Sequence, residues 1–146
     1  MLFRSQQNAL VFDGLFKIAL SEAEAQAGDL QRAIATLDEA LATVERAGFR
    51  AFEAELRRTR GEILLKLDSV VSALAEREFQ AAIAVAKQQS ARSFGLRAAL
   101  SLAKLHQSTT RPADAYAVLT PALEGFSPTP EMPEIAEAQA LMECLA

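Results

Sequence analysis

Apolar residues recur at intervals of three and four along nearly the whole chain, which is the periodicity of amphipathic α-helices. Gly28 predicts a left-handed end to a first helix, Asp29 predicts an N-cap for the next, and Gly48 predicts that helix's end. Between these residues the apolar positions are Leu30, Ala33, Ile34, Leu37, Ala40, Leu41 and Val44. No stretch has the period of two that is typical of a half-buried strand. The pattern therefore predicts an all-α fold.

Helix-breaking segments divide the chain into seven expected helices. Asp68-Ser69 offers a cap, Pro112 suits a first helical turn, and Ser127-Pro128-Thr129-Pro130 is the densest breaker. The helices are expected at about 8–27, 30–47, 50–67, 69–89, 91–107, 112–126 and 129–145, the last beginning near Thr129 or Pro133. Since no domain boundary is evident, we expect one domain over 1–146. Its helix pairs are expected at about 8–47, 50–89 and 91–126, and a C-terminal capping helix at about 129–145.

The second helix of each pair repeats one arrangement of small and large residues. A small residue is followed four positions later by a large one, and three further on by alanine and an aliphatic residue. The three instances are Ala33/Leu37/Ala40-Leu41, Ala75/Phe79/Ala82-Ile83 and Ala115/Leu119/Ala122-Leu123. Small residues let neighbouring helices approach, and the large one fills the space between pairs. This arrangement resembles the second half of the tetratricopeptide (TPR) motif, which implies a TPR-like α-solenoid of about three antiparallel pairs.

The first helix of each pair is expected to have a small residue where the paired helices cross. Ser21, Gly61 and Ala103 stand at these positions. A glycine inside a helix costs about 1 kcal/mol unless close packing offsets it, so Gly61 favours a close crossing. The chain departs from the TPR pattern in two ways. The glycine between paired helices is present only as Gly28, and the proline that often ends a repeat is missing, which predicts long second helices.

A narrower resemblance covers about residues 20–145. The segments 54–65, 91–103 and 129–141, in this order, are similar to the TPR-type C-terminal region of large bacterial regulators with an adenylate-cyclase-like or signal-responsive ATPase module. The resemblance implies a regulatory protein-interaction module. It implies no catalytic residue, because the chemistry of that family lies in a different region. His106 departs from the family, which tends to have an aromatic residue there.

Composition and charge narrow the class of protein. The chain has 146 residues, of which 51% are hydrophobic and 23% charged, as expected for a folded domain. A net charge of −4 argues against nucleic-acid binding. Charges interrupt every apolar stretch before the ~20 residues of a membrane span, and the N-terminus does not resemble a signal peptide. The single cysteine, Cys144, suits a reducing compartment, so we expect a cytoplasmic protein.

The sequence offers no catalytic, cofactor-binding or metal-binding set. No glycine-rich run precedes a lysine at phosphate-loop spacing, and one histidine and one cysteine make no zinc site. A nucleophilic pair of Cys144 and His106 has nothing to orient it. We expect His106 to fill a large position on the fifth helix, Tyr116 to pack at a rim, and Cys144 to be a small hydrophobic residue. The sequence therefore predicts a protein that is not an enzyme.

The first helices of the pairs line the concave face of a TPR array, so their cations are candidates for gripping a partner's carboxylates. These candidates are Arg57, Arg60, Arg97 and Lys104. For each of them, a simple contribution to solubility is the competing interpretation. The expected function is non-catalytic binding of another protein or peptide. The alternative is a helical domain that senses a small effector, which an enclosed apolar pocket would favour.

The first helix has a thin polar strip, although the end of a repeat array is usually polar. Its exposed apolar candidates are Leu2, Phe3, Val11, Phe12, Leu15 and Phe16. A broad apolar surface usually marks an interface, so we expect a two-fold homodimer through this helix, or packing against upstream repeats if the chain is a fragment. The alternative is that Leu2 and Phe3 fold back over their own helix.

Overall fold

A computed structural model of the chain describes residues 2–68, 72–126 and 131–146, with side chains from Arg4 onward. These residues form seven α-helices and no strand, which confirms the all-α prediction. The helices are α1 (Leu2–Gln26), α2 (Leu30–Ala47), α3 (Glu53–Leu67), α4 (Ser72–Gln88), α5 (Arg92–Ser108), α6 (Pro112–Leu123) and α7 (Pro133–Leu145). Within the described ranges, no helix is both long enough and apolar enough to cross a membrane.

Several helix ends lie at the predicted capping residues. Gly28 and Gly48 adopt the left-handed conformation, with φ of +89° and +68°. The Asp29 carboxylate accepts a hydrogen bond of 3.2 Å from the backbone N–H of Arg32, as an N-cap does. Pro112 lies in the first turn of α6, where its missing N–H has no cost. Local chemistry therefore sets these boundaries.

Two helices begin at other residues than the sequence predicts. α1 starts at Leu2 instead of about residue 8, because residues 2–7 contain no helix breaker. α3 starts at Glu53 instead of about residue 50, because the chain turns after Gly48 and the N–H of Glu53 bonds to the carbonyl of Arg50. Phe52 lies in this turn and packs closely against α1 at Gly14. A Cβ added to Gly14 would stand only 3.1 Å from the Phe52 ring. The predicted cap Ser69 and the alternative start Thr129 lie outside the described residues.

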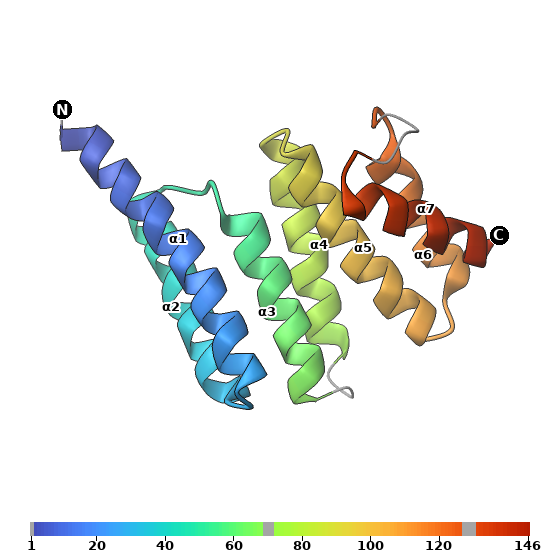
Figure 1. Ribbon diagram of the computed structural model, residues 1–146, viewed down its shortest axis with the longest axis horizontal. Coiled ribbons are helices and arrows are strands. Elements are labelled where there is room, and N and C mark those ends of the chain that lie inside the picture. The colour runs from blue at the N-terminus through green and yellow to red at the C-terminus, as the bar shows by residue number, and fades with distance from the viewer. Residues whose placement is uncertain (1, 69–71, 127–130) are drawn as a thin grey trace. The chain divides into compact units, whose positions relative to one another are not determined.

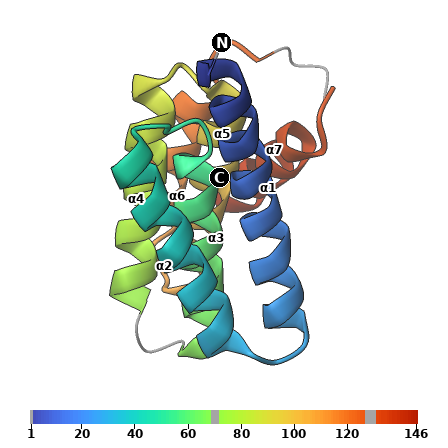
Figure 2. The same cartoon turned by 90° about the vertical axis from the view of Figure 1, so that its left-hand side faces the viewer.

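The chain divides into two compact units, Met1–Glu78 and Phe79–Ala146, and the division falls within α4. In the first unit, α1 and α2 are antiparallel neighbours, and α3 contacts both (Figures 1 and 2). Its core joins the inner faces of these three helices. The fully buried members are Ala33, Leu37, Ala40, Leu56 and Ile63, with Ile18, Ala25, Leu30, Ile34, Leu41 and Val44 packed around them.

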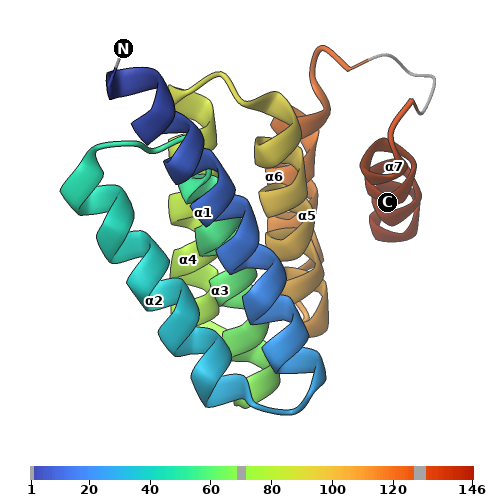
Figure 3. The ribbon, with the colours of Figure 1, turned by 60° about the vertical axis from the view of Figure 1, so that its left-hand side comes forward.

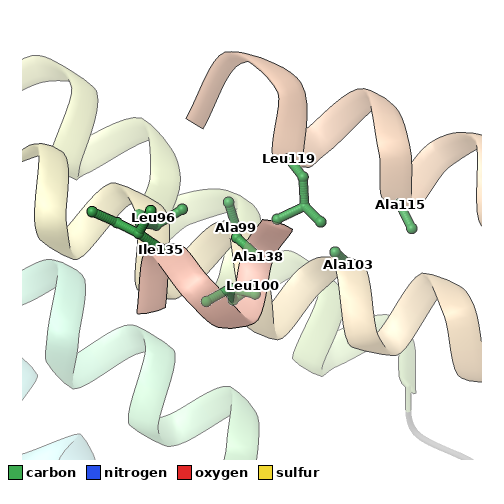
Figure 4. Close-up of a cluster of buried hydrophobic side chains, with 8 residues drawn as sticks. All are labelled: Leu96, Ala99, Leu100, Ala103, Ala115, Leu119, Ile135 and Ala138. Carbon is green, nitrogen blue, oxygen red and sulfur yellow. The ribbon is translucent and has the colours of Figure 1, made fainter. Parts of the chain in front are cut away.

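In the second unit, α5 and α6 are paired, and α7 contacts both of them. Figure 1 shows α7 running across this pair, and Figure 3 looks nearly along its axis. The core lies between the three helices and is drawn in Figure 4. It consists of Leu96, Ala99, Leu100, Ala103, Ala115, Leu119, Ile135 and Ala138.

The repeated small and large positions are buried in both units. Each of the three leading alanines and each of the three large residues has no exposed surface; these are Ala33, Ala75, Ala115, Leu37, Phe79 and Leu119. Ser21, Gly61 and Ala103, the small residues expected at helix crossings, are also buried. The aliphatic residues that close each set are half-buried at Leu41, Ile83 and Leu123. The sequence therefore located the buried side of each of these helices.

Candidate interaction site

Helix α3 carries its charged residues on two different faces. Glu53, Arg57 and Arg60 follow one another at spacings of four and three, so they share one face. Glu55, Arg58 and Glu62 share another face by the same spacings in the opposite order. The two sets have different neighbours, and this difference decides which residues can meet a ligand.

The first set forms a chain of ion pairs with α2 and α4. Arg50 and Arg57 donate to Glu53 at 2.5 Å and 3.0 Å, and Arg57 also lies 3.8 Å from Glu78. Arg60 lies 3.6 Å from Glu78 and donates to Asp38 at 2.8 Å. Arg57 and Arg60, two of the predicted groove cations, are thus engaged by acidic residues of the same unit.

Burial and neighbouring cations shift two carboxyl groups of this chain in opposite directions. Burial raises the pKa of Glu78, and the positive charges of Arg60 and Arg57 offset only part of that effect. Burial also acts to raise the pKa of Glu53, but hydrogen bonds from Arg50 and Arg57 outweigh it and leave this pKa lowered. Glu53 is therefore held as a carboxylate by two arginines.

Arg58 and Glu62 of the second set line a pocket between α1 and α3 with a volume of about 250 Å³. Most of its lining side chains are polar, and both signs of charge are present. The lining residues are Glu22, Ala25 and Gln26 of α1, and Arg58, Thr59, Glu62, Ile63 and Lys66 of α3. Both helices are first members of predicted pairs, and first helices are where the sequence predicts a binding face.

Arg58 is held in place at this pocket. Its Nε and one terminal nitrogen donate to the two carboxylate oxygens of Glu55, both at 3.1 Å, and Glu62 lies 3.9 Å from it. Burial acts to lower the pKa of Arg58, but the hydrogen bond and charge of Glu55, together with Glu62 and Glu22, raise it overall. A two-point pair of this kind fixes the plane of the guanidinium group.

Thr59 gives the pocket a polar group without a partner. Its side chain is 3% exposed, and its hydroxyl oxygen has no hydrogen bond. A buried hydroxyl left unpaired costs about 1–3 kcal/mol, so native structures usually satisfy such groups. A hydroxyl can both donate and accept, but this oxygen has almost no accessible surface, so a bound polypeptide would reach it only after neighbouring side chains shift.

The other two predicted groove cations lie in the second unit and contact α7. Arg97 of α5 lies 3.6 Å from Glu134, and Lys104 of α5 pairs with Glu137. These pairs help to hold the C-terminal helix on α5. The sequence contains a feature that is consistent with these pairs. After Arg111 the chain has glutamates but no lysine or arginine, so a helix in this segment can form ion pairs only with cations from elsewhere in the chain.

The predicted self-association residues lie on α1. Phe12, Leu15 and Phe16 are exposed, and Val11 is half-buried. The side chains of Leu2 and Phe3 lie outside the described residues.

The three residues that the sequence offers for chemistry differ in their exposure to solvent. His106 is buried on α5, Cys144 is exposed on α7, and Tyr116 is exposed on α6. Within the described ranges, no three histidine, cysteine or acidic side chains gather closely enough to hold a metal ion.

The sequence does not single out the pocket residues Arg58, Thr59, Glu62 and Lys66 as site residues. Their spacing already puts them on one face of α3, but the spacing of Arg57 and Arg60 does the same for another face. Comparison with known proteins adds no further assignment: no family model, no curated protein and no solved structure matches the chain.

Proposed function

We propose that this chain is a non-catalytic, TPR-like interaction module that binds a polypeptide segment of another protein at the pocket between α1 and α3. The observation that carries the proposal is a pocket lined by charges of both signs, with the buried, unpaired hydroxyl of Thr59 behind its surface. An extended peptide supplies amide donors and acceptors together with charged side chains, which matches such a lining.

The repeated small and large positions support the TPR-like part of the proposal. Their leading residues Ala33, Ala75 and Ala115 are 42 and 40 residues apart and fully buried. This period is longer than the 34 residues of a typical TPR. The lengths of α2 and α4, 18 and 17 residues, account for part of the difference. In this proposal the three helix pairs form a solenoid that α7 caps.

The character of the pocket favours a peptide over a small apolar effector. Drug-sized ligands usually occupy apolar pockets of about 300–1,000 Å³. The α1–α3 pocket is about 250 Å³ in volume, and only Ala25 and Ile63 among its lining residues are apolar. A regulatory role, as the resemblance to bacterial regulators implies, follows if the bound partner is a signalling protein.

Selection of a random-peptide library on the immobilised chain tests this function. We expect enriched peptides whose affinity falls about tenfold or more in Thr59→Val, which keeps the side-chain shape, and in Lys66→Glu. Lys87→Glu makes the same charge change at an exposed lysine of α4 that does not line the pocket, and it should bind like the wild type. No enrichment, or equal affinity in all variants, would count against the proposal.

A further inference from the structure

An apolar stripe runs along the outer side of α1. Phe12, Leu15 and Phe16 are 71%, 48% and 60% exposed, and their spacing of three and four puts them on one face. Ser21, on the opposite side of the helix, is fully buried against the rest of the first unit. The stripe is therefore turned away from the core that α1 forms with α2 and α3. Three large apolar side chains side by side on a surface usually mark an interface.

Two exposed residues of opposite charge flank this stripe. Arg4 and Glu22 are 18 residues apart, which at 3.6 residues per turn is about five turns, so they lie on the same side of the helix. A step of 100° per residue puts both within about 20° of Leu15 around the axis. Their midpoint is residue 13, next to Phe12 and close to the middle of α1.

We propose that a second copy of this chain covers the stripe, with the two α1 helices antiparallel and a two-fold axis near residue 13. In this arrangement each Arg4 faces the partner subunit's Glu22, and the aromatic stripes meet between the two ion pairs. An axis at residue 13 also overlaps nearly the whole of α1, which is about 37 Å long. This surface shares Glu22 with the peptide pocket, where the charge of Glu22 also acts on Arg58.

Charge complementarity favours a second copy of the chain as the partner, and it favours antiparallel over parallel α1 helices. In a parallel pair, Arg4 would face another Arg4 and Glu22 another Glu22, and like charges that face one another are unfavourable. Two-fold symmetry in the antiparallel pair turns one complementary contact into two. Exposed ion pairs contribute little individually, so the apolar stripe provides most of the affinity and the charges set the direction.

A charge-reversal cycle tests the proposal. We expect sedimentation equilibrium at low salt to show a dimer for the wild type. Arg4→Glu and Glu22→Arg should each raise the dimer dissociation constant by roughly tenfold, and the double variant should restore it. A wild type that is monomeric at every concentration would overturn the proposal. A dimer that neither single variant weakens, or that the double variant fails to restore, would overturn the antiparallel arrangement.

A second pair of variants tests the stripe itself. Phe12→Ser should abolish the dimer, whereas Tyr116→Ser, which removes an aromatic ring exposed to 44% on α6, should leave it intact. Circular dichroism should show that both variants keep their helices. A Phe12→Ser protein that dimerises like the wild type would show that the stripe is not the interface.

Discussion

At the scale of single residues, the unusual feature of this protein is the burial of charge at the start of α3. Glu53 and Glu55 are 5% and 4% exposed, and each is bound by arginine from its own helix or the turn before it. Buried carboxylates are tolerated when cations and hydrogen bonds replace their hydration. Their place in the first helical turn adds the favourable field of the helix N-terminus. These residues therefore fix the arginines, and through Arg58 they shape one wall of the pocket.

Replacement of Glu53 should destabilise the protein in a pH-dependent way. Glu53→Gln removes the charge that Arg50 and Arg57 share, and we expect a loss of about 1.5–3 kcal/mol at neutral pH. Because the folded-state pKa of Glu53 lies below its ordinary value of 4.5, its contribution is present above that pH. It is lost as the pH falls through the lowered folded value.

Urea denaturation of wild type and Glu53→Gln across this pH range measures the effect. The difference between the two should shrink on acidification. Glu39→Gln is the matched control, because Glu39 is paired with Lys17 at 3.2 Å but its side chain is 66% exposed. An equal loss in both variants would show that burial of Glu53 is not the cause.

At the scale of helices, packing depends on a large apolar side chain that lies among small ones in each repeat. Leu37 of α2 and Leu119 of α6 occupy equivalent repeat positions, and each is fully buried in the core of its own unit. Several residues of the same cores are alanines, whose short side chains cannot extend into a vacated space. Truncation at these positions therefore leaves a cavity.

Leu37→Ala and Leu119→Ala should each destabilise the protein by about 2–5 kcal/mol. Leu74→Ala, at a position on α4 that is 45% exposed, should cost much less. Denaturant unfolding followed by circular dichroism makes the comparison. Similar small losses at all three positions would mean that the repeat positions do not form the helix contacts.

At the scale of the whole molecule, association through α1 would tie stability to concentration. If two chains pair in the folded state and separate on unfolding, the melting temperature should rise by roughly 4 °C over a hundredfold increase in protein concentration. Phe12→Ser should remove this dependence. Scanning calorimetry at several concentrations measures it, and a wild-type melting temperature that stays constant would contradict association.

Much of the architecture follows from local chemistry that the sequence states directly. Asp29, Gly48 and Pro112 define helix ends through their own side chains or backbone conformations, and the structure has helix ends at each. The buried faces can also be predicted from the sequence. A helix with apolar residues at spacings of three and four has one apolar side, and that side is buried in the folded protein. The positions of Ala33, Leu37 and Ala40 are examples.

The candidate site could not be obtained in the same way. Helical periodicity puts Arg57 with Arg60 on one face of α3 and Arg58 with Glu62 on another, and both faces have the same mixed charge. Only packing decides that Asp38 and Glu78 engage the first face, and that α1 forms a pocket with the second. The same holds for Arg97 and Lys104 of α5, because their acidic partners lie on α7 and only packing brings them together.

The sequence by itself thus determined the helices, several of their ends and their apolar sides, because each depends on residues within one or two turns of one another. The tertiary structure alone decided that one charged face of α3 pairs with Asp38 and Glu78 while the other lines a pocket with α1, because these neighbours lie far away in the chain. Packing also leaves Phe12 and Phe16 exposed, because among the described residues no helix of the first unit covers this side of α1.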